Sequence, residues 1–334
     1  MTSVPLPATA QPRLRHATVS GIGTHIPSGV ITNADLETMV ETSDSWIMER
    51  TGIRTRHQVG GGETTASMGA SAARQAMAMA GIDSVDAIIC ATCSPDTLMP
   101  ATACLIQRDL SRDFNVLGVP AFDINAACSG YVYAIQVATS LVRGGSADRV
   151  LLIASESMTR LVDYQDRSTC VLFGDGAGAT VISVADAPGL RAIHWGADGS
   201  QAEIIYYGPM QDNADSPDAL RMAGRGTFRL AVDRLCAMCE EVAAESGWSL
   251  ADIDHVVPHQ ANQRIIEAAA KRLGFPMDRV LINLDEVGNT SAASIPLALG
   301  AAHAQGRVQI GDKILAVAFG AGATWGGFAL EWAP

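Results

Sequence analysis

Hydrophobic positions along the chain fall into two alternating kinds of segment. Short apolar runs, typical of buried strands, occupy residues 87–90, 149–154, 169–173, 255–257, 280–282 and 314–319. Longer segments with a helical spacing of apolar residues occupy 67–80, 101–110, 131–142, 228–246, 262–273 and 293–305. Because strands and helices alternate, the pattern predicts an α/β fold whose sheets are mixed or largely parallel.

The two halves of the chain resemble each other. The matched segments are 81–89 with 250–257 and 173–178 with 319–324. In each half a strand, a turn of small residues and a helix follow; the first turn contains Cys128 and the second contains Asn289. Several matches in the same order indicate a duplication, with the two turns brought together near a pseudo-twofold axis.

The repeat divides the chain into three expected parts. Residues 1–15, of which the first 14 include three prolines, are expected to form a flexible tail. Residues 16–185 form the N-terminal half, which carries the cysteine turn. Residues 186–334 form the C-terminal half.

Composition narrows the class of protein. Hydrophobic residues make up 48% of the 334 positions and charged residues 17%, which suits a compact α/β enzyme. The net charge of −12 argues against nucleic acid as a partner and allows an acidic protein to bind only at a local basic patch. No apolar run of about 18 residues and no signal peptide are present, so we expect a cytoplasmic protein without a membrane span.

Seven cysteines in a long chain are expected to be reduced thiols. Two pairs, Cys90 with Cys93 and Cys236 with Cys239, have C-x-x-C spacing. The pairs are far apart and have no histidine at zinc-like spacing, so core packing is the favoured interpretation and no metal is expected.

Three residues with reactive or hydrogen-bonding side chains, Cys128, His259 and Asn289, each lie at a strand-to-helix junction. At a helix N-terminus the thiol of Cys128 is expected to have a pKa below its free value of about 8.5, although a lone cysteine is more often an ordinary core residue. His259 follows a strand, and Asn289 lies in Gly-Asn-Thr-Ser; alone, each could be a loop residue or a helix cap. Together a cysteine, a histidine and a carboxamide form a recurring acyl-transfer set.

Glycine-rich segments raise the alternative of dinucleotide binding. Neither the segment at 174–178 nor that at 21–23 completes G-x-G-x-x-G, because Ala179 and Ile26 stand where the third glycine belongs. Close packing of the backbone is the favoured interpretation of these glycines.

Over residues 16–332 the chain resembles a known family, the 3-oxoacyl-acyl-carrier-protein synthases III. The resemblance rests on Ala-Ala-Cys-Ser-Gly at 126–130, Phe-Gly-Asp-Gly-Ala-Gly-Ala at 173–179, Pro-His-Gln-Ala-Asn at 258–262 and Gly-Asn-Thr-Ser-Ala-Ala-Ser at 288–294. It implies a duplicated thiolase fold with five αβαβα layers and two pseudo-twofold-related halves. It also implies a homodimer that uses a CoA thioester as substrate and needs no cofactor.

The resemblance implies a decarboxylative condensation that starts fatty acid or related polyketide synthesis. Cys128 would take the acyl group from acyl-CoA, and malonyl-acyl-carrier-protein would then lose carbon dioxide and attack it. His259 and Asn289 would donate hydrogen bonds to the enolate oxygen. The backbone N–H groups of Cys128 and Ala321 would form the oxyanion hole, although relatives usually have glycine at position 321.

The same resemblance implies binding residues. Trp46 and Arg167 would hold the adenine of CoA between them, and Asn262 would contact the pantetheine arm; alone, Trp46 would be taken for a core aromatic residue and Arg167 for a surface charge. The residues expected to bind the carrier protein are Gln260, Arg264, Arg229 and Lys271. For the helix that carries Arg264 and Lys271, an ordinary solvated face is the alternative.

The acyl pocket is expected to include Met99, Phe173 and Leu220. Met99 falls where the family places a gate residue from the partner subunit, and a flexible methionine there favours a longer or branched acyl chain. Two other functions stay open. One is a pathway-specific acyltransferase or ketosynthase of secondary metabolism, and the other is a non-catalytic partner subunit, against which the presence of Cys128 argues.

Overall fold

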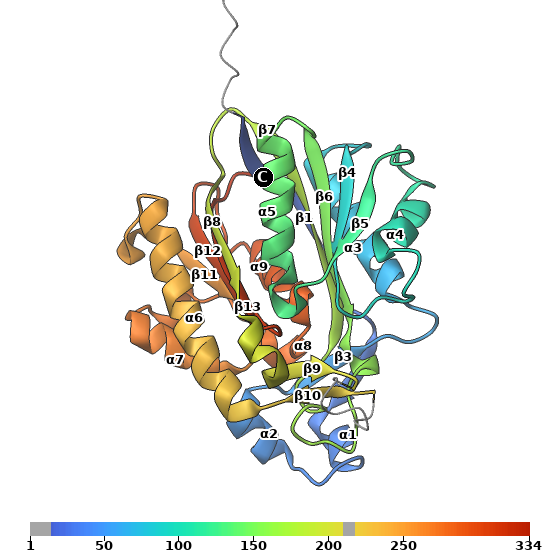
Figure 1. The fold of residues 1–334 in the computed structure, drawn as a ribbon, viewed down its shortest axis with the longest axis vertical. Helices are drawn as coiled ribbons and strands as arrows, with labels where there is room; N and C mark the ends of the chain where they lie inside the picture. The colour runs from blue at the N-terminus through green and yellow to red at the C-terminus, as the bar shows by residue number, and fades with distance from the viewer. Residues whose placement is uncertain (1–14, 210–217) are drawn as a thin grey trace, which may run out of the picture.

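The computed structural model describes residues 15–209 and 218–334. The expected flexible tail, residues 1–15, lies outside the described residues except for Arg15. Two sheets form the centre of the structure, and helices lie on both sides of each sheet (Figure 1). This arrangement confirms the α/β prediction.

The first sheet contains five strands from the N-terminal half. Its order is β1 (His16–His25), β7 (Asp175–Ala185), β6 (Arg149–Ser157), β4 (Ala87–Ala91) and β5 (Ala121–Ile124). Strand β4 runs parallel to β5 and β6, whereas β7 is antiparallel to β1 and β6. This mixture agrees with the predicted mixed sheet.

The second sheet repeats this order with strands from the C-terminal half. Its order is β8 (Leu190–Ala197), β13 (Thr324–Glu331), β12 (Lys313–Gly320) and β11 (His255–Pro258). Strand β11 is parallel to β12, and the other neighbours are antiparallel. Val280 adds a single parallel bridge to Val256, in the place that β5 occupies in the first sheet.

Helices complete five layers. Helices α3 (Thr65–Ala80) and α4 (Thr102–Leu110) cover the outer face of the first sheet, and α6 (Gly224–Glu245) and α7 (Gln263–Leu273) cover that of the second. Helices α5 (Gly130–Arg143) and α9 (Ser294–Ala304) lie between the sheets (Figure 1). Most side chains of α5 and α9 are buried, which explains why both sequences are apolar on nearly every face.

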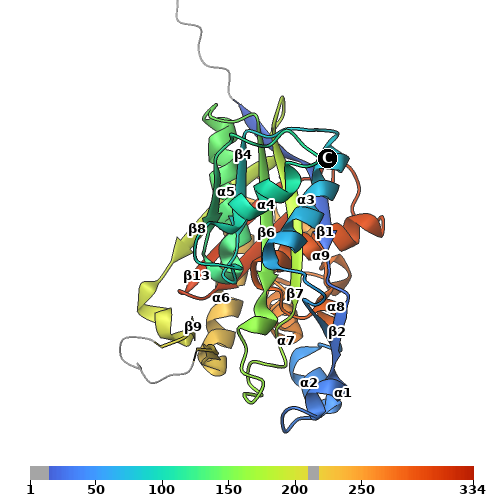
Figure 2. The same ribbon diagram turned by 90° about the vertical axis from the view of Figure 1, so that its right-hand side faces the viewer.

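Smaller elements gather at one end of the molecule (Figures 1 and 2). They are β2 (Gly29–Thr32), α1 (Asn33–Glu37), α2 (Asp44–Thr51), β3 (Thr55–Gln58), β9 (Ile205–Tyr207), β10 (Leu220–Met222) and α8 (Leu284–Val287). Of these, α2, β9 and β10 contribute directly to the site described below.

Glycines allow the layers to approach closely, as the sequence predicted. A Cβ atom on Gly21 or Gly23 of β1 would clash with backbone carbonyl oxygens of α3, and a Cβ on Gly178 would lie 2.5 Å from Pro296 of α9. These close contacts support the packing interpretation of the glycine-rich segments over dinucleotide binding.

Two predicted strands are wrong: residues 280–282 form only the single bridge of Val280, and residues 169–173 form no strand either. Residues 169–172 form turns, Phe173 makes only an isolated bridge to Asn289, and β7 begins at Asp175. The Asp166 carbonyl oxygen accepts hydrogen bonds from the N–H groups of Thr169 and Cys170 at 3.2 and 3.1 Å, which curls the chain. The apolar run resembles a strand, but Val171, Leu172 and Phe173 are buried for a different reason: they line a cavity.

The duplication can be followed residue by residue. The Asp86 carboxylate accepts from the N–H of Arg149, and the Asp254 carboxylate accepts from the N–H of Lys313 in the second half. Counting forward from this shared contact aligns β4 with β11, so that Ala91 and His259 are equivalent positions.

Candidate active site

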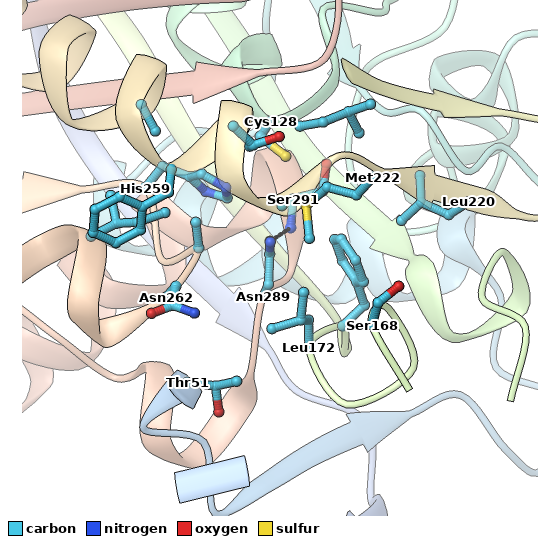
Figure 3. A pocket seen from close by; sticks show the side chains of 18 of the residues that line it. Thr51, Cys128, Ser168, Leu172, Leu220, Met222, His259, Asn262, Asn289 and Ser291 are labelled. Carbon is cyan, nitrogen blue, oxygen red and sulfur yellow. Dashed lines mark hydrogen bonds between the residues drawn. The ribbon is translucent and has the colours of Figure 1, made fainter. Parts of the chain in front are cut away.

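A cavity of about 390 Å³ opens where the two halves meet. The residues that line it include Cys128, His259, Asn289, Ser291 and Ala321. Figure 3 shows the side chains of His259, Asn289 and Ser291 grouped around Cys128. The three residues picked from separate strand-to-helix junctions therefore share one cavity.

Cys128 lies in a short 3-10 turn, Ala127–Ser129, that leads into α5. Ala127 has a left-handed φ of 46°, and its N–H donates to the Asn125 side chain at 3.1 Å. Gly320 of β12 lies against the turn, since a Cβ there would be 2.8 Å from the backbone nitrogen of Cys128. The nucleophile is thus held between a strained turn and the end of a strand from the other half.

The pKa of Cys128 differs from the sequence-based expectation. Burial raises the pKa of the thiol to about 12, and the nearby Glu156 carboxylate acts in the same direction. Hydrogen bonds from the Ser291 hydroxyl and from the cysteine's own backbone N–H oppose this rise. The predicted lowering is wrong because loss of hydration outweighs the favourable contacts of the thiolate at the helix N-terminus.

Asn289 lies in the equivalent turn of the second half. Its side-chain oxygen accepts the N–H of Ser291 at 2.9 Å, and Ser291 has a left-handed φ of 48°. The backbone of Asn289 is also fixed, since its N–H donates to the Leu172 carbonyl at 2.8 Å. Because the amide oxygen is used within the turn, the NH₂ group is left to donate toward the cavity.

His259 follows β11 and is 3% exposed. Burial lowers the pKa of its imidazole to about 3, so the ring is neutral near pH 7. Its Nδ1 lies 2.7 Å from the Ser294 hydroxyl oxygen. A neutral ring is what the expected donor role requires.

The sequence did not indicate a polar cluster behind Cys128. Cys93 Sγ lies 3.4 Å from a carboxylate oxygen of Glu156 and 3.5 Å from the Ser291 hydroxyl. Glu156 is fully buried, burial raises its pKa, and it accepts hydrogen bonds from Thr92, Cys93 and Ser94. Cys93 also lines the cavity, which corrects its assignment to the core. Its C-x-x-C spacing with Cys90 did not show this, because its partners Glu156 and Ser291 come from distant segments.

Trp46 and Arg167 lie at the mouth of the cavity. The Arg167 guanidinium carbon is 4.6 Å from the centre of the Trp46 ring, and its NH1 donates to the Glu41 carbonyl at 2.8 Å. Arg50, one turn further along α2, also lies over this ring at 5.0 Å and lines the cavity. Its i,i+4 spacing from Trp46 could have identified Arg50 from the sequence.

Comparison with known proteins identifies the family. Residues 122–199 match the family model for 3-oxoacyl-[acyl-carrier-protein] synthase III, and residues 243–332 match the model for its C-terminal part. The beta-ketoacyl-[acyl-carrier-protein] synthase III of Coxiella burnetii is 45% identical over 321 residues, which cover 95% of this chain and 100% of the relative. The chain belongs to the 3-oxoacyl-[acyl-carrier-protein] synthase III family.

Solved structures agree with this family. The 3-oxoacyl-[acyl-carrier-protein] synthase III of Aquifex aeolicus is 43% identical with a TM-score of 0.89, covering 95% of this chain and 100% of that one. The priming β-ketosynthase of the R1128 polyketide biosynthetic pathway is 35% identical with a TM-score of 0.90, covering 97% of this chain and 98% of that one. The thiolase fold implied by the sequence is confirmed.

Asn262 is the N-cap of α7 in this synthase III chain. Its side-chain oxygen accepts the N–H of Arg264 at 2.9 Å, and its NH₂ donates to the Arg50 carbonyl at 2.9 Å. It lines the cavity, as does Thr51. Its hydrogen bonds show that it also joins α7 to α2.

The basic residues expected to meet a carrier protein are only partly arranged as predicted. Arg229 on α6 and both Arg264 and Lys271 on α7 are exposed. Gln260 is fully buried, and its side-chain NH₂ donates to the Pro258 carbonyl at 2.6 Å. A surface contact by Gln260 is therefore contradicted, because its amide group holds the loop after β11 from inside.

Two of the three expected acyl-pocket residues line the cavity. Phe173 and Leu220 are 4% and 7% exposed and belong to its apolar wall. Met99 is 79% exposed on the surface of its own chain and does not line this cavity. That Met99 acts on a partner subunit stays a prediction.

The remaining expectations concern metal and membrane. All seven cysteines are free, and Cys90, Cys236 and Cys239 are buried in the core. Within residues 15–209 and 218–334, no group of three or more His, Cys, Asp or Glu side chains is placed to hold a metal ion. Among the helices in that same part of the chain, none is both long and apolar enough to cross a membrane.

Proposed function

We propose that this synthase III chain condenses an acyl-CoA primer with malonyl-acyl-carrier-protein to give 3-oxoacyl-acyl-carrier-protein. The observation that carries the proposal is the orientation of donors around Cys128. The Asn289 amide and the neutral His259 ring face the cavity that contains the thiol. Two donors that face the same cavity can stabilise an enolate, which is the species that decarboxylation of a malonyl thioester produces.

In the first half-reaction the Cys128 sulfur attacks the thioester carbonyl carbon and CoA leaves as its thiol. The backbone N–H groups of Cys128 and Ala321 are proposed to bind the carbonyl oxygen as it becomes an oxyanion. Both residues line the cavity, and a backbone donor is retained when alanine replaces glycine at position 321. The product of this step is an acyl group held on Cys128.

In the second half-reaction the malonyl thioester loses carbon dioxide. His259 and Asn289 donate hydrogen bonds to the thioester oxygen, where the negative charge of the enolate collects. The enolate carbon then attacks the acyl carbonyl, and Cys128 is released. No cofactor is assigned to either half-reaction, and CoA enters as part of the substrate.

Trp46 and Arg167 are proposed to bind the adenine of CoA. With 4.6 Å between the guanidinium and the indole centre, a flat ring cannot fit between them. Arg167 must therefore move away from Trp46 to admit adenine, breaking its hydrogen bond to Glu41. Asn262 is placed to contact the pantetheine arm between this stack and Cys128.

The protein is proposed to act as a cytoplasmic homodimer. Strand β5 is the edge of the first sheet, and Phe122 on it is partly exposed. Leu98 and Met99 are 90% and 79% exposed, which is unusual for large apolar side chains outside an interface. Pairing of two copies along β5 would cover these residues and bring Met99 to the partner's acyl pocket.

Intact-mass spectrometry tests the function directly. The protein is incubated with acetyl-CoA to dodecanoyl-CoA, including branched primers, and then with malonyl-acyl-carrier-protein. An acyl adduct that is then discharged as a 3-oxoacyl product is expected. An adduct that persists in the presence of malonyl-acyl-carrier-protein would contradict condensation.

The primer panel also tests the acyl pocket. The wall formed by Leu220, Met222 and Phe173 is apolar, which favours primers longer than acetyl. The second candidate function, priming of a polyketide or other secondary pathway, is favoured by the similarity to the R1128 priming β-ketosynthase. A preference for an unusual primer would support it, whereas strict use of acetyl-CoA would contradict the longer-chain pocket.

A further inference from the structure

One difference between the two halves lies at the first residue of the central helices α5 and α9. Counting from the equivalent asparagines Asn125 and Asn289, Gly130 corresponds to Ser294 at the start of the following helix. A Cβ on Gly130 would lie 3.4 Å from the Cβ of Ala91, and Ala91 is the position equivalent to His259. The second half therefore has a hydroxyl beside a histidine where the first half has a glycine beside an alanine.

The hydrogen bonds of Ser294 decide where its proton points. The backbone N–H of Gln260, which can only donate, points to the Ser294 oxygen at 3.3 Å. The same oxygen lies 2.7 Å from Nδ1 of His259. In the described part of the chain the Ser294 hydroxyl has no other hydrogen-bond acceptor, so its proton is donated to Nδ1.

We propose that Ser294 is a positioning residue that holds His259 in the tautomer with its proton on Nε2. With Nδ1 occupied as an acceptor, the neutral ring carries its only N–H on the opposite side. That N–H is the donor that the decarboxylation step needs. Ser294 is fully buried, and His259 is nearly so, so water does not compete for either group.

The same tautomer prevents His259 from acting as a base toward the Cys128 thiol. An Nε2 that already carries a proton cannot accept the Cys128 proton during acyl loading. Ser294 thus separates the two half-reactions, because it favours His259 as a donor to the malonyl thioester and disfavours it as a base toward the thiol. The inference rests on the proposed function and deepens it.

The test uses Ser294→Ala with two companion variants. Ser294→Thr keeps the hydroxyl, and Thr290→Val removes a buried hydroxyl from the same turn that has no hydrogen-bond partner in the described structure. In Ser294→Ala, release of carbon dioxide from malonyl-acyl-carrier-protein is expected to fall about tenfold in kcat. Acyl loading, followed by intact mass, is expected to stay within about twofold. Ser294→Thr is expected to recover decarboxylation, and Thr290→Val to leave both steps unchanged.

The tautomer itself is read by nuclear magnetic resonance of protein labelled with ¹⁵N in its seven histidines. The signals of His259 are assigned by their absence in His259→Asn. In the parent and in Ser294→Thr the proton is expected on Nε2 alone, whereas Ser294→Ala is expected to show a mixture or a shifted Nδ1 signal.

Two results would overturn the inference. One is a His259 ring protonated on Nδ1 in the parent. The other is an equal loss of loading and decarboxylation in Ser294→Ala, which would indicate general damage to the fold. If the parent released no carbon dioxide at all, the proposed function would fail, yet the resonance measurement would still report the tautomer.

Discussion

The two turns that meet at the cavity have nearly the same backbone and different chemistry. Each begins with an asparagine whose side chain accepts the N–H two residues later, at 3.1 Å for Asn125 and 2.9 Å for Asn289. Each then has a non-glycine residue with left-handed φ and a short 3-10 turn that leads into a central helix. The repeated element is thus a strained turn aimed at the interface of the halves.

Function uses different positions of this turn in each half. The fourth residue is Cys128 in the first copy and Ala292 in the second, whereas the first residue contributes to the cavity only as Asn289. Likewise His259 is matched by Ala91 in the first half. The duplication produced two similar turns. Each functional side chain has a counterpart in the other half to which no role in the reaction is assigned, so the counterpart can be mutated as a control.

The largest expected effect comes from removing the nucleophile. Cys128→Ala should abolish the acyl adduct and lower turnover by about 10⁴-fold or more, because no other group can hold the acyl chain. Cys93→Ala, which removes the second thiol of the cavity, should retain the adduct. An acyl adduct on Cys128→Ala would show that another residue is the nucleophile and would contradict the assignment of Cys128.

Asn289→Asp tests the first position of the turn. The carboxylate keeps the acceptor for the Ser291 N–H but replaces the NH₂ donor, so decarboxylation should fall by about 10²–10³-fold. Asn125→Asp makes the same change in the other copy and should leave the rate within about threefold. The measurement is the rate of carbon dioxide release by both variants. Equal losses would show that the two asparagines only stabilise the backbone of their turns and that Asn289 is not a donor to the substrate.

The stability of the protein at acid pH tests whether burial holds His259 neutral. Ala91, the equivalent residue of the first half, has no titratable side chain. The folded pKa of about 3 lies below the ordinary value of 6.5, so the unfolded chain binds the proton more readily and stability is lost as the pH falls below 6.5. Between pH 8 and pH 5 this should cost about 2 kcal/mol.

The matched measurement is urea unfolding of the parent and of His259→Asn at both pH values. The variant should lack this loss, while contributions from other buried groups, such as Glu156 and Asp175, cancel in the comparison. An identical pH dependence in both proteins would show that His259 is not held neutral by burial.

The smallest expected effect concerns the outer helices. Arg229→Glu on α6 should raise the apparent KM for malonyl-acyl-carrier-protein about fivefold without slowing acyl loading. Arg74→Glu on α3, the equivalent outer helix of the first half, should change neither step by more than about twofold. Arg264 is a less selective probe, since it also lines the cavity. Steady-state kinetics over a range of salt concentrations would measure the difference. Equal effects of Arg229→Glu and Arg74→Glu would contradict a carrier-protein contact at Arg229.

Prediction from sequence succeeded where the signal was local or repeated. Five of the six predicted helices end within about two residues of the observed bounds, and the sixth, α6, begins four residues earlier, at Gly224. The segment 169–173 failed because apolar side chains facing a cavity look like a buried strand. The prediction for Gln260 failed because its side chain turns inward to contacts that include the carbonyl of Leu281, 21 residues away, and the sequence does not show this contact.

The sequence by itself determined the alternation of strands and helices, the duplication and the positions of Cys128, His259 and Asn289. Only the tertiary structure decided which atoms of these residues face the cavity and in what protonation state. The physical reason is that hydrophobic period and turn chemistry act between neighbours along the chain. The pKa values and the tautomer instead depend on water exclusion and on partners such as Ser294 and Glu156, which exist only once distant segments have packed together.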